Sequence, residues 1–258
     1  MQRDHPSGVK LTVLAGTVVK SLPSTGLFVQ GTLNAAGTKD NSVVFTSIKQ
    51  DAYGGDSNGD GSATTPAAGN WYGLFLDGVG ASASLLDHAI IEYGGQPLNN
   101  WHGASWTNDL VFWQAAATLQ NSQVRFGDWG VYVQQAAVNL YSNTIVSNTN
   151  SGVYVAATSY PTITANVFQN NGRCAIDVPV DDIPNITNNQ LECCVLPRLG
   201  QVLCSARHTL FGKEASKNVG GGLALLELVV NMQDQGVNKR LGLLTTRLPD
   251  GFGGQVTF

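Results

Sequence analysis

The chain has 258 residues and a formal net charge of −4; only 12% of its residues are charged, and glycine occurs 30 times. This composition is typical of a turn-rich β-protein. Residues 1–190 hold 7 basic and 13 acidic residues, which argues against a nucleic acid as partner, because phosphate binding needs clustered basic side chains. No run of 18 apolar residues occurs, so we expect no membrane span.

The start of the chain carries no recognisable export signal. Met1–His5 lacks the basic start and the apolar core of a secretory signal peptide. A strand-like pattern begins by residue 11, within Leu11–Lys20, and nothing before it would cap a fold. We therefore expect that the sequence begins inside a longer coil. The alternative is that an export signal has been removed.

Short apolar runs return along the chain, with two long gaps between them. The runs expected as first strands are Leu27–Val29, Leu74–Leu76, Val111–Trp113, Val131–Val133, Val153–Val155 and Ile176–Val178. Their starts lie 47, 37, 20, 22 and 23 residues apart, and the two long intervals predict insertions at about 48–72 and 94–110. Each insertion leaves after an expected third strand and returns before a first strand. We therefore expect both to project from one corner on adjacent rungs and to form the walls of a cleft.

The first insertion contains a candidate cation site. Asp56, Asn58 and Asp60 alternate with small residues and glycines, a spacing that lets oxygen ligands converge on Ca²⁺. The twelfth position of this loop is Ala67, which excludes a complete EF-hand, because the closing bidentate glutamate is missing. The sequence predicts calcium as the cofactor here. The alternative is a flexible loop without a metal.

The unusual side chains gather around the predicted corner, and their chemistry suits a sugar site. Indole rings stack on the C–H surfaces of sugars, and carboxylates accept hydrogen bonds from hydroxyls or move protons. The candidate catalytic residues are Asp77, Asp109 and Asp128. The candidate substrate-binding residues are Trp71, Trp101, His102, Trp106, Arg125 and Trp129. The alternative is that the tryptophans only close the insertions onto the coil.

Strand alternation predicts a second surface feature. Asp77 is expected to point outward, and the two-residue period then places Phe75 outward as well. By the same register, an outward aromatic column would contain Phe28, Phe75, Phe112, Tyr132 and Tyr154, beside Gln30, Asp77, Gln114 and Gln134. Such a strip would hold an extended glycan. Alternatively, it is the surface on which the insertions or the C-terminal segment pack.

A block that returns every 22 or 23 residues marks the second half of the chain. Gly130–Val133 comes back as Gly152–Val155 and as Ala175–Val178. A fixed period in this range predicts a solenoid, here with three short strands per turn and rungs about 4.8 Å apart. Asparagines recur on the same period, and we expect them to stack as an amide ladder at one corner. They are Asn121, Asn143, Asn166 and Asn189.

These repeats, together with the opening Leu11–Lys20, resemble the right-handed parallel β-helix repeat of bacterial extracellular proteins, the pectate-lyase-like superfamily. The resemblance covers roughly residues 8–190. It implies an all-β, right-handed, single-stranded parallel β-helix solenoid with two loop insertions, placed at the cell surface or outside the cell. It implies no single activity, because this coil serves lyases, glycoside hydrolases, adhesins and structural stalks.

The repeat stops after about residue 190, and 191–258 forms an atypical segment with 7 basic and 5 acidic residues. Its apolar run Leu223–Met232 predicts one helix, so the segment is expected to be irregular and partly helical. It is either a cap on the open end of the solenoid or a tail that is out of frame or fused. The four cysteines (Cys174, Cys193, Cys194 and Cys204) form no zinc motif and are expected as buried or free thiols.

Two classes of function fit these observations. In the first, the protein hydrolyses or eliminates at an extracellular polysaccharide, and a carboxylate pair for hydrolysis needs a separation between roughly 5 and 9.5 Å. In the second, it is a noncatalytic module that binds glycan or acts in adhesion. A further alternative is calcium-assisted hydrolysis of a small ester or lactone. The sequence does not indicate the substrate or the oligomeric state.

Overall fold

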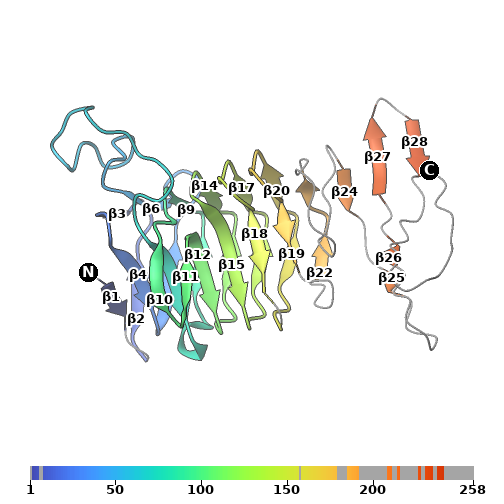
Figure 1. The fold of residues 1–258 in the computed structure, drawn as a ribbon, viewed down its shortest axis with the longest axis horizontal. Coiled ribbons are helices and arrows are strands. Elements are labelled where there is room, and N and C mark those ends of the chain that lie inside the picture. The colour runs from blue at the N-terminus through green and yellow to red at the C-terminus, as the bar shows by residue number, and fades with distance from the viewer. Residues whose placement is uncertain are drawn as a thin grey trace.

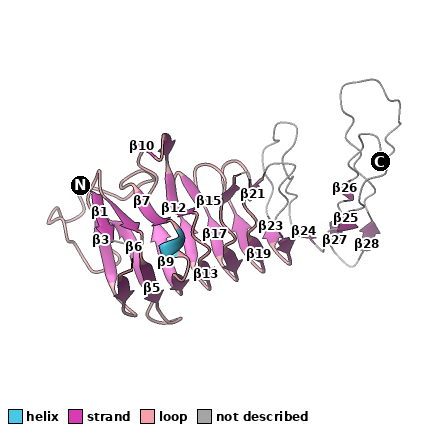
Figure 2. Ribbon diagram, turned by 90° about the horizontal axis from the view of Figure 1, so that it is seen from below, coloured by secondary structure: helices cyan, strands magenta, loops and turns pink. Residues whose placement is uncertain are grey.

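The structure is a computed structural model. It describes residues 8–156, 158–178 and 185–191, and outside these ranges only the backbone of strands β1 and β24 to β28. Within the described residues the fold is a parallel β-helix made almost entirely of strands (Figure 1). The one helical element described is the single turn η1 (Val79–Ala81) (Figure 2).

Three parallel sheets form the faces of the coil. Sheet A contains β1 (Gln2–His5), β4 (Gly26–Val29), β7 (Gly73–Asp77), β12 (Asn108–Trp113), β15 (Trp129–Gln134), β18 (Val153–Val155) and β21 (Ile176–Asp177). Sheet B contains β2 (Lys10–Val13), β5 (Thr32–Ala36), β8 (Leu85–Asp87), β13 (Thr118–Gln120), β16 (Asn139–Tyr141), β19 (Thr162–Thr164) and β22 (Asn185–Thr187). Sheet C contains β3 (Val18–Ser21), β6 (Val43–Ser47), β9 (Ala89–Glu92), β14 (Gln123–Arg125), β17 (Thr144–Val146), β20 (Val167–Gln169) and β23 (Gln190–Leu191).

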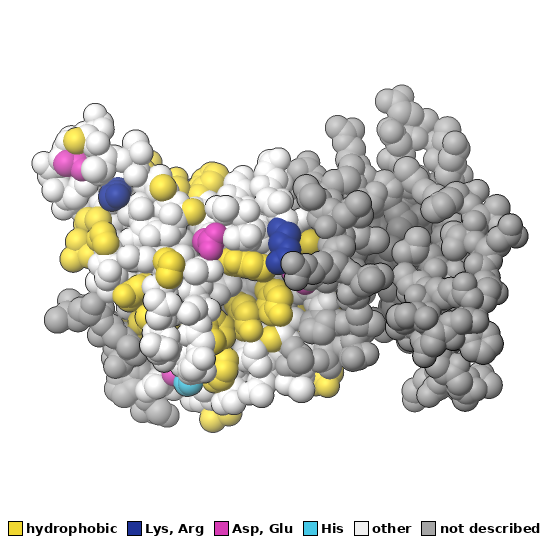
Figure 3. All heavy atoms as spheres, in the orientation of Figure 1, with side chains coloured by type: hydrophobic (Ala, Val, Ile, Leu, Met, Phe, Trp, Pro, Cys, Tyr) yellow, Lys and Arg dark blue, Asp and Glu magenta, His cyan; other side chains and the backbone are white. Residues whose placement is uncertain are grey.

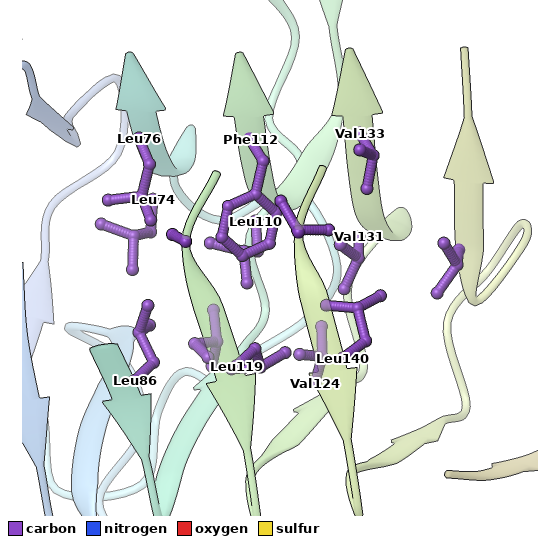
Figure 4. Close-up of a cluster of buried hydrophobic side chains, with 14 of the residues drawn as sticks. Leu74, Leu76, Leu86, Leu110, Phe112, Leu119, Val124, Val131, Val133 and Leu140 are labelled. Carbon is purple, nitrogen blue, oxygen red and sulfur yellow. The ribbon is translucent and has the colours of Figure 1, made fainter. Parts of the chain in front are cut away.

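The core lies inside the coil, where each rung contributes apolar side chains at alternate strand positions. In sheet A, Leu110 pairs in register with Leu74 and Val131. All three are fully buried and face inward side chains of the other sheets, including Leu119 and Val124 (Figure 4). The two-residue period of a strand therefore separates an inner apolar face from an outer face that is free to carry function.

An asparagine ladder stabilises the corner between sheets B and C, as predicted for three of the four residues. The backbone N–H of Asn143 donates to Asn166 Oδ1 at 2.8 Å, and that of Asn166 donates to Asn189 Oδ1 at 2.9 Å. The prediction is wrong for Asn121, because the interval is one residue shorter there and Ser122 takes the ladder position. Asn121 has a left-handed φ of 50° and donates to Asp87 instead.

A second ladder, at the corner between sheets C and A, was missed. The backbone N–H of Gly127 donates to Asn148 Oδ1 at 3.1 Å, and that of Asn148 donates to Asn171 Oδ1 at 3.2 Å. The signal was present in the sequence, because Asn148 and Asn171 lie 23 residues apart. Two stacked amide lines therefore hold successive corners of the second half of the coil.

Both insertions leave the coil at the predicted corner, and their bases run side by side: the N–H of Gly69 donates to the carbonyl of Gly94 at 2.7 Å. Beyond that point they diverge, so the prediction that they form the walls of one cleft is wrong. The start of the first insertion folds over the outer face of sheet C, where Gln50 donates to Glu92. The second insertion forms the hairpin β10 (Leu98–Trp101) and β11 (Ala104–Trp106), which lies over sheet A (Figure 1).

The C-terminal segment is described only as strands, namely β24 (His208–Leu210), β25 (Glu214–Ala215), β26 (Leu226–Glu227), β27 (Val230–Asp234) and β28 (Val237–Arg240). The predicted helix is therefore wrong where the run is described. A short apolar run suits a strand as well as a helix, and β27 pairs antiparallel with β24 and β28. The rest of the predicted helix lies outside the described residues, as do Cys193, Cys194 and Cys204. Cys174 is fully buried.

Candidate functional site

The outer face of sheet A carries the predicted aromatic column, with one correction. Phe28, Phe75, Tyr132 and Tyr154 share one register position, but Val111 occupies the place expected for Phe112. Phe112 points into the core, because β12 is offset by one residue from the alignment of apolar runs. The neighbouring outward position is likewise Trp113 rather than Gln114, since Trp113 pairs with Asp77 and Gln134.

The β10–β11 hairpin covers the N-terminal half of this column. The Trp101 ring centroid lies 4.9 Å from that of Phe75 and 5.9 Å from that of Phe28. Trp106 donates from Nε1 to the carbonyl of Trp101 at 2.7 Å. Phe28 and Phe75 are consequently buried. This confirms the interpretation that an insertion packs on the aromatic surface, for that half of the column.

The C-terminal half of the column opens into a pocket of about 270 Å³ beside the hairpin. It is lined by Ala104, Ser105, Trp106, Thr107, Asn108, Trp129, Tyr132 and Tyr154. Figure 3 shows hydrophobic side chains gathered on this face of the coil. The Tyr132 and Tyr154 rings stack at 5.0 Å, while Trp106 meets Tyr132 edge to face at 4.7 Å.

Tyrosine chemistry adds a polar component to this aromatic pocket. The Tyr132 hydroxyl donates to Gln134 Oε1 at 3.0 Å. Burial, with a smaller contribution from Tyr154, raises the pKa of Tyr132 to about 12. The phenol therefore stays protonated over the physiological range and acts as a neutral hydrogen-bond donor.

A charged pair that the sequence reasoning missed lies beside Trp129, one of the residues that line the pocket. The Arg173 guanidinium lies over the Trp129 ring at 5.6 Å, and its Nη1 is 3.8 Å from Asp177 Oδ2. Asp177 pairs in register with Tyr154, so alignment of Ala175–Val178 with Gly152–Val155 would have placed it on the outer face.

Asp77 and His102 meet on the other side of the hairpin, away from the pocket. The Asp77 Oδ1 to His102 Nε2 distance is 2.9 Å, and Gln30 Nε2 donates to Asp77 Oδ2 at 3.1 Å. The His102 ring stacks on Trp113 at 4.5 Å with an interplanar angle of 4°. The structure thus brings together two residues that the sequence assigned to different roles.

Asp109 lies beneath the surface, where the two insertions part. Its side chain is fully buried; Oδ1 accepts from the N–H of Gly94 at 2.6 Å, and Oδ2 has no hydrogen-bond partner. Burial raises the pKa of Asp109 well above its usual range, and the nearby Glu92 and Asp128 charges add to that shift. A Cβ at Gly127 would collide with this carboxyl group. Asp109 is therefore not accessible from the surface.

The remaining two candidate carboxylates are far apart. Asp128 directly precedes β15 and accepts from Asn150 Nδ2 at 2.8 Å, whereas Asp77 is aligned with Gln134 at the opposite end of β15. The five residue steps from Trp129 to Gln134 span about 16 Å. This exceeds the roughly 9.5 Å that an inverting carboxylate pair tolerates. The structure does not assemble the three predicted catalytic residues into one centre.

The predicted substrate-binding residues also separate into groups. Trp106 and Trp129 line the pocket, while Trp101 and His102 belong to the hairpin that forms one of its walls. Trp71 is buried in the core and donates from Nε1 to the carbonyl of Glu92 at 2.9 Å. Arg125 lies on sheet C, where it binds Glu92, Tyr53 and Gln123. Trp71 and Arg125 are therefore not part of the pocket.

The first insertion brings together three carboxylates. Ligand oxygens of Asp51, Asp56 and Asp60 all lie within 4.8 Å of one another. Oδ1 of Asp51 and Oδ1 of Asp60 are buried without a hydrogen-bond partner. Asp56 accepts from the N–H groups of Gly59, Asp60 and Gly61, and the bond from Gly61 contributes most to lowering its pKa.

Asn58 and Asp51 differ from the sequence prediction of this site. Asn58 turns its amide nitrogen toward Asp60 Oδ2 at 2.7 Å, so in this rotamer it offers a donor and not an oxygen ligand. Asp51 was missed because it lies five residues before Asp56, outside the alternating pattern. The two unpartnered oxygens fit a hard cation, which prefers carboxylate ligands.

Comparison with known proteins gives one match. A family model described as "Right handed beta helix region" matches residues 72–228, more than half of the chain. Comparison with curated proteins and comparison with solved structures each found no match. Within the described part of the chain, none of the helical structure is long and apolar enough to cross a membrane.

Proposed function

The chain belongs to the right-handed β-helix family, and from this premise we propose that it binds glycan, holding one sugar residue in the pocket between the β10–β11 hairpin and sheet A. The family alone indicates no particular function. The observation that carries the proposal is the composition of the pocket: Trp106, Trp129, Tyr132 and Tyr154 surround a hollow whose remaining lining is mostly polar.

The chemistry of this lining matches that of a sugar. Indole and phenol rings contact the apolar C–H surfaces of a pyranose, and Ser105, Thr107 and Asn108 add hydrogen-bonding groups to the lining. A volume of about 270 Å³ is near the lower limit of small-molecule pockets. This size suits one sugar ring, with the rest of a chain extending over the surface.

Binding is favoured over hydrolysis by the positions of the carboxylates. Asp109 is buried, and Asp77 and Asp128 lie at opposite ends of their strands, whereas hydrolysis by a carboxylate pair needs both groups at one bond. We therefore propose a noncatalytic glycan-binding role, at the cell surface or outside the cell. The alternative is catalysis, either elimination or hydrolysis of a polysaccharide or calcium-assisted hydrolysis of a small ester or lactone.

The experiment measures glycan binding by calorimetry with soluble hexasaccharides of β-1,4-linked glucose, xylose, mannose and N-acetylglucosamine and of α-1,4-linked galacturonate. Trp129→Ala should weaken the best binder by about 5- to 150-fold, the equivalent of roughly 1–3 kcal/mol for a lost aromatic anchor. Tyr141→Ala is the matched control, because Tyr141 is an exposed aromatic residue on sheet B. Equal affinity in both variants would contradict the proposal, and release of new reducing or unsaturated ends would show an enzyme.

We also propose that the first insertion binds Ca²⁺ through Asp51, Asp56 and Asp60. The unpartnered buried oxygens of Asp51 and Asp60 support this, because an unpaired buried carboxylate oxygen is costly without a cation or a donor. The ion would tie the start of the insertion to its tip. It would contribute to stability, because a ligand that binds only the folded state raises the unfolding free energy.

Thermal unfolding with calcium and with chelator tests the metal. Calcium should raise the melting temperature of the wild-type protein, and Asp51→Asn together with Asp60→Asn should remove that increase. Asp40→Asn, a change at an exposed carboxylate outside the insertion, should leave it intact. No heat of binding at millimolar calcium would disprove the site.

A further inference from the structure

The walls of the pocket come from two parts of the molecule that differ in how firmly they are held. Asn108, Trp129, Tyr132 and Tyr154 lie on β12, β15 and β18 of sheet A, and each of these three strands is paired on both sides. The opposite wall, 104–107, comes from β11 and the residue that follows it. The shape of the pocket therefore depends on where the hairpin rests.

The hairpin has little backbone pairing to hold it. β10 and β11 form a separate two-stranded sheet, and their register shifts between the Leu98–Trp106 and Trp101–Ala104 pairs. A two-stranded hairpin is at best marginally stable in water. Backbone bonds hold only its two bases, where the N–H of Gln96 donates to the carbonyl of Trp71 and the N–H of Trp129 donates to the carbonyl of Thr107. The position of the rest of the hairpin therefore depends on side chains that dock onto sheet A.

Two docking contacts lie at the two ends of the hairpin. Near the pocket, Trp106 is 3% exposed and packs against Tyr132. At the turn, His102 lies between Trp113, on which it stacks, and Asp77, whose carboxylate it meets at 2.9 Å. The side chain of Asp77 is only 10% exposed, and the bond from Gln30 orients it.

We propose that Asp77 and His102 are positioning residues for the pocket, a proposal that rests on glycan binding there. Neither residue lines the pocket. In this geometry His102 Nε2 carries the hydrogen and donates to Asp77, which fixes the turn of the hairpin on the rigid sheet. With the turn fixed, Ser105 and Trp106 are held opposite Trp129. Loss of the contact frees the wall and weakens binding without removing any group that touches the sugar.

Hydrogen exchange of residues 98–107, measured by mass spectrometry on the full chain without ligand, tests the positioning directly. Asp77→Ala should speed exchange in the hairpin by about tenfold or more, the scale of one hydrogen bond to a charged group. Asp77→Asn should restore slow exchange. The Oδ1 of the introduced asparagine still accepts from His102, and the Gln30 side chain can rotate so that its amide oxygen accepts from the new NH₂ group. Affinity for the best binder of the hexasaccharide panel should follow the same order.

Two further variants keep the test decisive. His102→Ala should reproduce Asp77→Ala; its side chain is 36% exposed at the hairpin turn, so the coil should still fold. Trp129→Ala should weaken binding by about 5- to 150-fold while leaving hairpin exchange slow. Unchanged exchange in Asp77→Ala, or equal acceleration in Asp77→Ala and Asp77→Asn, would overturn the positioning role. If no hexasaccharide binds the wild-type chain, the binding proposal fails, and the exchange data still decide the role of Asp77.

Discussion

The two insertions leave the same corner on adjacent rungs, yet opposite chemistry holds them on different faces. The first is anchored by polar groups: Arg125 binds both the buried Glu92 and the Tyr53 hydroxyl, and Lys20 donates to the carbonyl of Gly55. The second is anchored by aromatic rings, with Trp101 and Trp106 packed on the outer column of sheet A. The side chains on the outer face of each sheet, and not the point of exit, thus determine where an inserted loop rests.

The polar anchor and the aromatic anchor also differ in how they are expected to contribute to stability. Breaking a buried ion pair leaves an uncompensated charge and is strongly destabilising. Aromatic packing is spread over several rings, so a single change lowers it more gradually. Glu92 is also part of β9 in the coil, whereas Trp101 belongs only to the hairpin. Loss of the polar anchor should therefore lower the free energy of unfolding of the whole coil, whereas loss of the aromatic anchor should mainly release the hairpin.

The largest effect is expected from the polar anchor. Arg125→Met should lower the free energy of unfolding by about 3 kcal/mol, because it leaves the carboxylate of Glu92 buried without its cation. Urea denaturation measures this loss. The double variant Glu92→Leu with Arg125→Met should recover part of the stability. A loss within about 0.5 kcal/mol for the single variant would show that the pair contributes little.

A smaller and local effect is expected from the aromatic anchor. Trp101→Ala removes the ring that covers Phe28 and Phe75. Because Trp101 is only partly buried, we expect a loss of about 2 kcal/mol, below that of a fully buried tryptophan. Most of this should appear as undocking of the hairpin and not as earlier unfolding of the coil. Hydrogen exchange should therefore accelerate in residues 98–107, with the urea midpoint nearly unchanged. Equal acceleration in the strands of sheet A would contradict this separation.

The smallest effect on the free energy of unfolding is expected from Asp109, which lies where the insertions part. This effect depends on pH. The folded pKa of Asp109 is raised by burial, while the unfolded value is about 3.9. Between these values the folded chain keeps a proton that the unfolded chain has lost, so stability falls as pH rises through this window. Asp109→Asn should remove that contribution. The difference between variant and wild type in unfolding free energy should be small near pH 4 and should favour the variant increasingly toward neutral pH.

Denaturation at several pH values checks this prediction. A wild-type profile and an Asp109→Asn profile that run parallel from pH 4 to 7 would contradict it. Asp40→Asn serves as the control, since Asp40 is exposed and its removal should not change the slope.

Much of the architecture was predictable because a solenoid repeats its local interactions. The 23-residue spacing of Asn143, Asn166 and Asn189 reports a stack in which each amide serves the next rung, and the structure confirms it. The failures come from single-residue changes in that spacing. A rung shorter by one residue places Ser122 where Asn121 was expected, and a one-residue offset turns Phe112 inward. A period of two makes such a slip reverse the face of a side chain.

The candidate site was predictable only in its residue types. Repeat spacing identified the parallel coil, its three-strand rungs and the two exits, because these follow from local strand patterns and stacked amides. Packing of the loops assigned Trp106 and Trp129 to a pocket, Trp71 to the core and Asp109 to a buried position. No repeat links residue 106 to residue 129. Their meeting depends on which sheet face offers the better surface to an inserted hairpin, and that is a property of the folded coil.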